Sequence, residues 1–157
     1  MQGIKNPLTF LTDGQGLSCF GSNNAQISEL LRNADLRPTR QRVALAKLLY
    51  SKGKRHVSAE LLHEEAKHEN VPVSLATIYN TLHQFKDAGL LQAVVIDSSK
   101  TWFDTNVVHH HHFFVEDDNR VFDVPVGDVE FGKLPEPPDG MEISKIDVVV
   151  RLRRKSE

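Results

Sequence analysis

The chain has 157 residues, of which 39% are hydrophobic and 25% charged, and its formal net charge is −2. These values are ordinary for a globular protein with one domain or two small ones. The sequence has no apolar run of 18 residues, no secretory signal and one cysteine, Cys19, which excludes a transmembrane helix, an internal disulfide and a cysteine-based zinc site. We therefore expect a cytoplasmic protein without a membrane partner.

The first 24 residues are rich in Gly, Ser, Asn and Thr and show no hydrophobic period, which predicts a flexible arm. A basic segment follows between Leu36 and Ala59, without any acidic residue. Its basic residues are Arg37, Arg40, Arg42, Lys47, Lys52, Lys54 and Arg55. A segment of this kind indicates nucleic acid as the partner. The alternative is a solvated helix face, although such faces usually mix charges of both signs.

Polar caps and apolar periods predict helices at about 24–33, 40–51, 59–68 and 74–89. The caps are Asn24, Thr39, Ser58 and Ser74, and glycines end the second and fourth helices. The expected core positions are Ile27, Leu30, Leu31, Val43, Leu45, Leu48, Leu49, Leu61, Leu62, Ala66, Leu75, Ile78, Leu82 and Phe85.

The helix at 74–89 carries almost no charge on the face opposite its apolar stripe. That face holds Ala76, Thr77, Asn80, Thr81 and Gln84, with Tyr79 at its edge. Asn and Gln can hydrogen-bond adenine, and Thr methyl groups can contact thymine, so this face is suited to a DNA major groove. An uncharged solvated face remains the alternative.

The fold class is predicted from the order of the elements. Two β-patterned runs, 91–96 and 101–103, flank a turn, and helices followed by a hairpin are typical of a winged helix-turn-helix. After a hinge at 104–106, strands are expected at 108–115, 120–124 and 143–153, with one helical turn near 128–131 and a Pro-rich loop at 134–140. We therefore predict an α+β protein with a winged-helix DNA-binding domain at 25–104 and a small C-terminal α/β domain at 105–157. That sheet is too small to bury a core alone, and a second copy would complete it.

Four successive histidines, His109 to His112, lie within the apolar run from Val108 to Val115. Because side chains alternate along a strand, His109 and His111 would share one face, and His110 and His112 the other. Imidazole binds zinc, iron, copper and nickel and is the commonest axial ligand of haem. A tag-like or solvated polar stretch is the alternative.

Several motifs resemble the ferric uptake regulator superfamily in order and spacing, over about residues 27–153. They are Leu36-Arg37-Pro38-Thr39-Arg40-Gln41-Arg42, His56-Val57-Ser58-Ala59-Glu60, Ala76-Thr77-Ile78-Tyr79-Asn80-Thr81-Leu82 and the histidine run. Within the superfamily the chain looks most like the iron response regulators (Irr) of rhizobia and related alphaproteobacteria. The resemblance implies a transcriptional regulator rather than an enzyme. It also implies a homodimer, with a dimer of dimers as a larger assembly, bound to double-stranded operator DNA through the N-terminal domain and paired through a C-terminal dimerisation domain.

The resemblance also implies metal sites. The superfamily's site between the domains falls on His56, Asp104, His110 and His112, with Asp123 as a further ligand. This set suits a divalent ion such as Zn²⁺, Mn²⁺ or Fe²⁺.

A second superfamily site, in the dimerisation domain, falls on His109, His111 and Glu130. It is incomplete, because Ile146 stands where the superfamily has a histidine ligand. The superfamily's four-cysteine structural zinc site is absent, since Val115 and Asp118 stand at its first two cysteine positions.

The residues expected to contact DNA lie in the N-terminal domain. They are Arg37, Arg40, Ser74, Thr77, Tyr79 and Asn80. By the resemblance, Arg37 falls at the superfamily's minor-groove basic residue and Tyr79 at its base-contacting tyrosine. Asn80 replaces the usual arginine, which should change the preferred DNA sequence.

The resemblance to iron response regulators implies haem sensing, with haem delivered by a haem-biosynthesis enzyme. Operator DNA would be bound when iron is scarce and released by haem. We hypothesise that His109, His110 or His111 becomes an axial haem ligand, which removes an imidazole from the metal-site strand and lowers DNA affinity. Cys19 is followed by Phe20, so the Cys-Pro haem motif of some relatives is missing.

Three other functions compete with haem sensing. The first is a metal-dependent repressor of the same superfamily, responding to Mn, Fe or Zn without haem. A small metalloenzyme would need a general acid or base beside the histidines, and no candidate is evident. A metal-storage module would leave the basic segment unexplained.

Overall fold

The computed structural model describes residues 23–96 and 98–156. The chain divides after Val107 into two compact units, which we call the helical unit and the strand unit. The arm predicted for residues 1–24 lies almost wholly outside the described residues. None of the helices in the described part has both the length and the apolarity needed to cross a bilayer.

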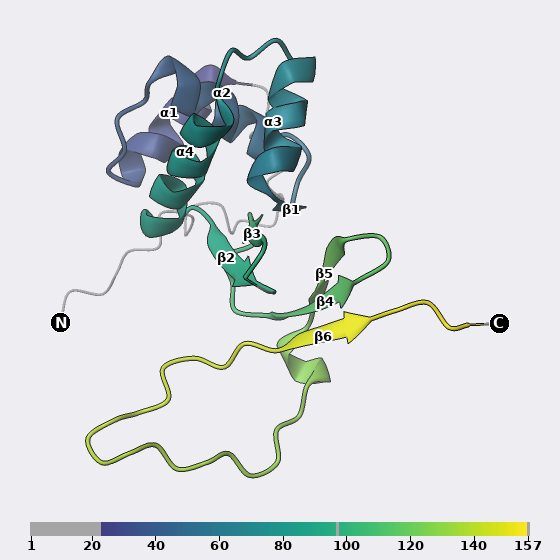
Figure 1. Ribbon diagram of the computed structural model, residues 1–157. Helices are drawn as coiled ribbons and strands as arrows, with labels where there is room; N and C mark the ends of the chain where they lie inside the picture. The colour runs from purple at the N-terminus through teal and green to yellow at the C-terminus, as the bar shows by residue number, and fades with distance from the viewer. Residues whose placement is uncertain (1–22, 97, 157) are drawn as a thin grey trace. The chain divides into compact units, whose positions relative to one another are not determined.

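The helical unit contains α1 (Asn24–Asn33), α2 (Arg40–Tyr50), β1 (His56–Val57), α3 (Ala59–His68), α4 (Leu75–Asp87), β2 (Gln92–Val95) and β3 (Thr101–Asp104) (Figure 1). The predicted caps Thr39, Ser58 and Ser74 each accept a backbone N–H of the following helical turn. At α1 the cap is Asn23 rather than Asn24. Local capping chemistry therefore fixes where these helices begin.

The apolar stripes of the helices meet in one closed core. Its fully buried side chains include Ile27, Leu45, Leu49, Ile78 and Phe85. The prediction was wrong for Leu61, which is 41% exposed. On α3 the buried face is formed by Ala59, Leu62 and Ala66, and Leu61 lies outside that stripe.

A three-stranded antiparallel sheet in the order β1-β3-β2 completes the helical unit. The β2–β3 hairpin confirms the predicted wing, whereas β1 was not predicted. The pairing of β1 with β3 sets His56 opposite Asp104.

The strand unit contains β4 (His111–Val115), β5 (Arg120–Val124), a 3-10 turn (Val126–Asp128) and β6 (Val149–Leu152). The strand order is β5-β4-β6, antiparallel between β4 and β5 and parallel between β4 and β6. The predicted strands at 108–115 and 143–153 were both too long, since β4 begins at His111 and β6 at Val149. The helical turn lies at 126–128 instead of 128–131. The Pro-rich loop predicted at 134–140 contains no helix or strand, as expected.

The two faces of this sheet differ in chemistry. His112, Asp123 and Val149 lie side by side on one face, by their register. Phe113, Phe122 and Val150 form the neighbouring row on the other face. The α+β class predicted from the sequence is confirmed, and the sheet register places the histidines.

Candidate functional site

In the helical unit, His56 and Asp104 form an imidazole–carboxylate pair. His56 Nε2 lies 3.0 Å from Asp104 Oδ2, and the Asp104 side chain is fully buried. The other carboxylate oxygen, Oδ1, accepts the backbone N–H of Asn106 at 2.8 Å. Just beyond this pair, the Arg55 N–H donates to Thr105 Oγ1 at 2.8 Å and the Thr105 N–H donates to the Arg55 carbonyl at 3.0 Å. These hydrogen bonds fix the strand ends that carry the pair.

In the strand unit, His110, His112 and Asp123 lie together. His112 stands opposite Asp123 across the β4–β5 ladder, and His110 Nε2 lies 3.0 Å from Asp123 Oδ1. The rings of His110 and His112 have centroids 4.5 Å apart. The ligand atoms of the three residues lie within 4.8 Å of one another. Although β4 begins only at His111, the alternation expected from the sequence is present.

The donor chemistry of both groups fits a divalent cation. His110 Nδ1 lies 2.6 Å from the Val108 carbonyl, which places the ring proton on Nδ1 and leaves Nε2 as the ligating nitrogen. In each pair an imidazole nitrogen and a carboxylate oxygen approach to 3.0 Å, an arrangement stabilised by a bound cation or a shared proton. Imidazole with carboxylate is a ligand mixture suited to zinc, iron and manganese.

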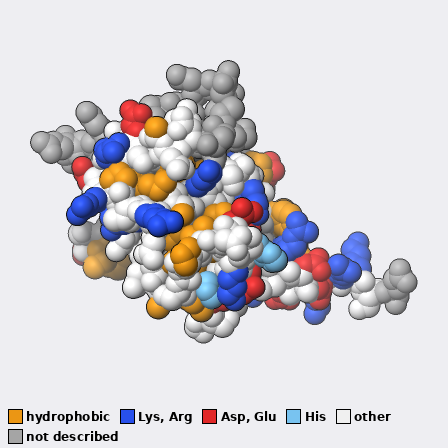
Figure 2. Space-filling model, turned by 90° about the horizontal axis from the view of Figure 1, so that it is seen from above, with side chains coloured by type: hydrophobic (Ala, Val, Ile, Leu, Met, Phe, Trp, Pro, Cys, Tyr) orange, Lys and Arg blue, Asp and Glu red, His pale blue; other side chains and the backbone are white. Residues whose placement is uncertain are grey.

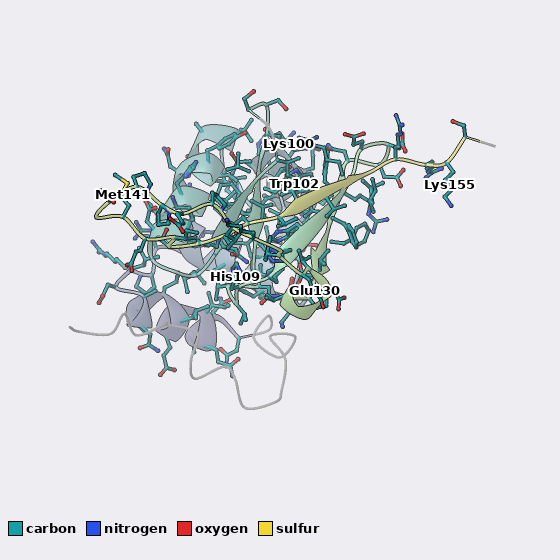
Figure 3. The ribbon with its side chains drawn as sticks, turned by 90° about the horizontal axis from the view of Figure 1, so that it is seen from below. Lys100, Trp102, His109, Glu130, Met141 and Lys155 are labelled. Atoms are coloured by element: carbon teal, nitrogen blue, oxygen red, sulfur yellow. The ribbon has the colours of Figure 1, made fainter. Side chains whose placement is uncertain are left out.

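The residues of the second predicted metal site do not all lie close together. His109 and His111 have ring centroids 5.4 Å apart, but Glu130 does not join them in a metal-ligating group within the described residues. Its neighbour Phe131 instead packs edge-on against His111 at 5.8 Å. Figure 3 shows the positions of His109 and Glu130. His109 is the exposed member of the histidine run.

His111 is buried and hydrogen-bonded to the residue before β6. It is 1% exposed, and its Nδ1 accepts the Val148 N–H at 3.3 Å. The ring proton therefore lies on Nε2, which makes no hydrogen bond within the described part of the chain. Burial lowers the pKa of His111. The neutral ring is favoured, and ligation through Nε2 would require the Val148 hydrogen bond to break.

The predicted DNA residues lie on α4 and around the start of α2. Asn80, Arg37 and Arg40 are exposed, and Tyr79 is half-buried. The Ser74 and Thr77 hydroxyls are 2.9 Å apart at the cap of α4. Figure 2 shows Lys and Arg side chains spread over the face that it presents.

Part of the predicted reading face of α4 has a structural role. Thr81 is only 5% exposed, and the Gln84 amide oxygen accepts hydrogen bonds from Arg42 Nε at 3.2 Å and Nη2 at 2.8 Å. Arg42 Nη1 also donates to the Arg37 carbonyl at 3.0 Å. Arg42 thus joins the Arg37 loop to α4. Sequence reasoning missed this bridge because its two ends are 42 residues apart and no local pattern links them.

Glu60 was also missed. It lies in the first turn of α3, and its carboxylate accepts the Tyr79 hydroxyl at 2.6 Å. An acid in the first turn of a helix is ordinary, so no sequence pattern indicated that Glu60 contacts α4.

Comparisons with known proteins identify the family of the chain. The model of the ferric uptake regulator family matches residues 33–150. The ferric uptake regulation protein of Bordetella parapertussis is 36% identical over 76 residues, which are 48% of this chain and 55% of that protein. The peroxide-responsive repressor PerR of Staphylococcus aureus is 33% identical over 93 residues, 59% of this chain and 62% of that protein. The chain spans about half the length of the first of these relatives.

A solved structure extends the likeness over both units. The ferric uptake regulator from Pseudomonas aeruginosa with manganese superposes with a TM-score of 0.60 at 27% identity, covering 80% of this chain and 96% of that one. The family match covers most of the chain, including both groups of imidazole and carboxylate side chains. This chain therefore belongs to the ferric uptake regulator family.

Proposed function

We propose that this protein is a metal-responsive transcriptional regulator that binds operator DNA as a homodimer. The observation that carries the proposal is the helical unit itself, in which a wing follows a capped helix that exposes Asn80, while the same unit carries the His56–Asp104 pair. DNA recognition and metal ligation thus share one small scaffold. Neither a metalloenzyme nor a storage module requires such a helix.

The metal role is proposed for both groups of ligands. We propose that His56, Asp104, His110 and His112 bind one divalent ion, with Asp123 as a further ligand. Support comes from the donor types and from the close approach within each pair. The set His109, His111 and Glu130 is the weaker candidate, because Glu130 lies apart from the histidines.

The DNA contacts are proposed for α4 and the start of α2. Tyr79 and Asn80 would face base edges, while Arg37 and Arg40 would contact the backbone or minor groove. Ser74 and Thr77 lie at the N-terminus of α4, which favours phosphate oxygens. A second copy would place two such helices on a two-fold operator.

Haem sensing is the finer part of the proposal. It rests on His109, which is exposed, next to His110 and His111, whose rings take part in metal-site or strand contacts. Axial ligation by His110 or His111 would compete with those contacts. A ligand that changes DNA affinity in this way needs only different affinities for the two conformations.

The test is DNA binding by the full chain in the apo, Mn²⁺, Fe²⁺ and haem states, by fluorescence anisotropy on two-fold-symmetric A/T-rich DNA. We expect steep salt dependence and loss of binding with haem. A His109/His110/His111 triple alanine variant should lose both the haem Soret band and the haem effect. Unchanged haem behaviour in the variant would leave the alternative, a metal-dependent repressor without haem sensing.

A further inference from the structure

The hydroxyl of Tyr79 is held by an acid from another helix. Tyr79 donates its hydroxyl proton to Glu60 Oε1 at 2.6 Å, so the side chains of α3 and α4 are linked at the edge of the proposed reading face. Glu60 is exposed, and Tyr79 is half-buried. The hydrogen bond lowers the pKa of Glu60 and raises that of Tyr79, as expected for a phenol donating to a carboxylate.

This contact determines what Tyr79 can offer a ligand. A tyrosine hydroxyl has one proton to donate and lone pairs that accept. While the proton points at Glu60, the hydroxyl can only accept. In the major groove the donors are the amino groups of adenine (N6) and cytosine (N4), whereas guanine O6 and N7 and thymine O4 are acceptors. The Glu60 carboxylate also only accepts hydrogen bonds, so it would repel guanine O6 and N7 and thymine O4.

We propose that Glu60 determines base specificity by fixing Tyr79 as a hydrogen-bond acceptor, so that the pair selects an adenine or cytosine amino group and rejects guanine. The inference rests on the proposed function, because it requires α4 to lie in the major groove. Glu60 acts through the direction of one proton and needs no contact of its own with the base.

The experiment is selection from a randomised half-site library by the full-length protein, comparing wild type, Glu60→Gln, Tyr79→Phe and the double variant. A glutamine at 60 can donate as well as accept, so the Tyr79 proton is no longer directed. We expect Glu60→Gln to reduce the preference for adenine or cytosine at one half-site position by about tenfold, which corresponds to about 1.4 kcal/mol. In the Tyr79→Phe background the same substitution should have no effect on base preference.

The matched control is Glu64→Gln. Glu64 lies on the same helix, is exposed and pairs with Lys67, so its neutralisation removes the same charge away from Tyr79. Each variant removes an acid that repels phosphate, so each should gain a little affinity for all DNA sequences, but only Glu60→Gln should also change the base preference.

The outcomes separate this inference from the proposed function. A Glu60→Gln profile identical to wild type overturns the inference, as does an equal effect with and without the Tyr79 hydroxyl. If the wild type selects no sequence, or Asn80→Ala and Tyr79→Ala leave binding unchanged, the proposed role of α4 fails instead. Thermal unfolding of each variant verifies that the fold is intact.

Discussion

The helical unit and the strand unit are each stabilised internally in a different way. The helical unit has a closed core whose members, such as Leu45, Leu49 and Phe85, are completely buried. In the strand unit the buried large apolar side chains are Phe114, Val121 and Val124, within the described residues. Its exposed large apolar side chains are Val108, Phe122, Val126, Phe131, Leu134, Met141, Ile143, Val150 and Leu152.

The strand unit also buries groups that cost free energy to bury. His110, His111 and His112 are each at most 6% exposed. A polar group removed from water must find a partner, and a three-stranded sheet with one thin apolar layer has little to offset the cost. The helical unit is therefore expected to be stable by itself, while the strand unit depends on what binds to it.

The largest expected effect is on the core of the helical unit. Leu49→Ala should reduce the free energy of unfolding by about 2–5 kcal/mol, because it leaves a cavity where a side chain was completely buried. Urea unfolding followed by the helical circular dichroism signal measures it. The control is Leu61→Ala on α3, which removes an exposed leucine and should cost under about 0.5 kcal/mol. Equal losses would contradict a core that excludes Leu61.

The next effect concerns the divalent ion that we propose for this protein. Mn²⁺ at about one hundred times its Kd should stabilise the folded protein by about 2.7 kcal/mol. Hydrogen exchange should slow at β4 and β5, because His112 and Asp123 are fixed there. His112→Ala should abolish the protection and His68→Ala, an exposed histidine on α3, should keep it. Protection that survives His112→Ala would remove this residue from the ligand set.

A third effect concerns the ion pair of Arg55, the residue before His56, with Glu65. Arg55 binds Glu65 with both nitrogens, at 2.6 and 3.0 Å, and both side chains are mostly buried. Arg55→Ala should cost about 1.5–3 kcal/mol. Lys52, 58% exposed, also contacts Glu65, and Lys52→Ala is the control, with a loss under about 1 kcal/mol.

The Arg55 effect should depend on pH. Burial raises the pKa of Glu65, but the hydrogen bonds from Arg55 and Lys52 outweigh it and keep the pKa below its ordinary value of 4.5. A carboxyl group with a lowered folded pKa contributes stability above the unfolded pKa and loses it as pH falls through the folded one. The difference between wild type and Arg55→Ala should thus shrink below pH 4.5. A constant difference would show that Arg55 acts through packing alone.

The smallest effect tests the open face of the strand unit. Phe113, Phe122 and Val150 form an apolar row across β5-β4-β6, and Phe122 is 42% exposed. If a second copy covers this row, Phe122→Ser should weaken dimerisation by about tenfold, or about 1.4 kcal/mol. Analytical ultracentrifugation measures it, with Val95→Ser, an exposed valine of the helical unit, as control. An unchanged dimer would place the interface elsewhere.

Much of the helical unit was predictable because its signals are local. Thr39, Ser58 and Ser74 cap helices through bonds to the next turn, and apolar spacing identified Ile78, Leu82 and Phe85 as buried. The elements that were not predicted depend on residues distant in the sequence. Strand β1 has two residues and therefore no period, and it exists only because β3 pairs with it.

The site shows the same division. Alternation along the strand predicted that His110 and His112 lie together, which they do. The roles of Glu60, Arg42 and Gln84 depend on which helices pack together, so no residue pattern contained them. The strands predicted for β4 and β6 began too early in the sequence. A β-patterned sequence can extend beyond the point where a neighbouring strand is available to pair with it.

The parallel pairing of β6 with β4 has a consequence for the order of folding. Val149 lies beside His112, so the contact must wait for nearly the whole strand unit to be synthesised. Closing so long a loop is entropically costly, and non-local parallel pairing is slow. The contacts among α1 to α4 join neighbouring stretches and form early in a chain made from its N-terminus. The helical unit of a nascent chain would thus form before β4, which carries His111 and His112, has its full set of neighbouring strands.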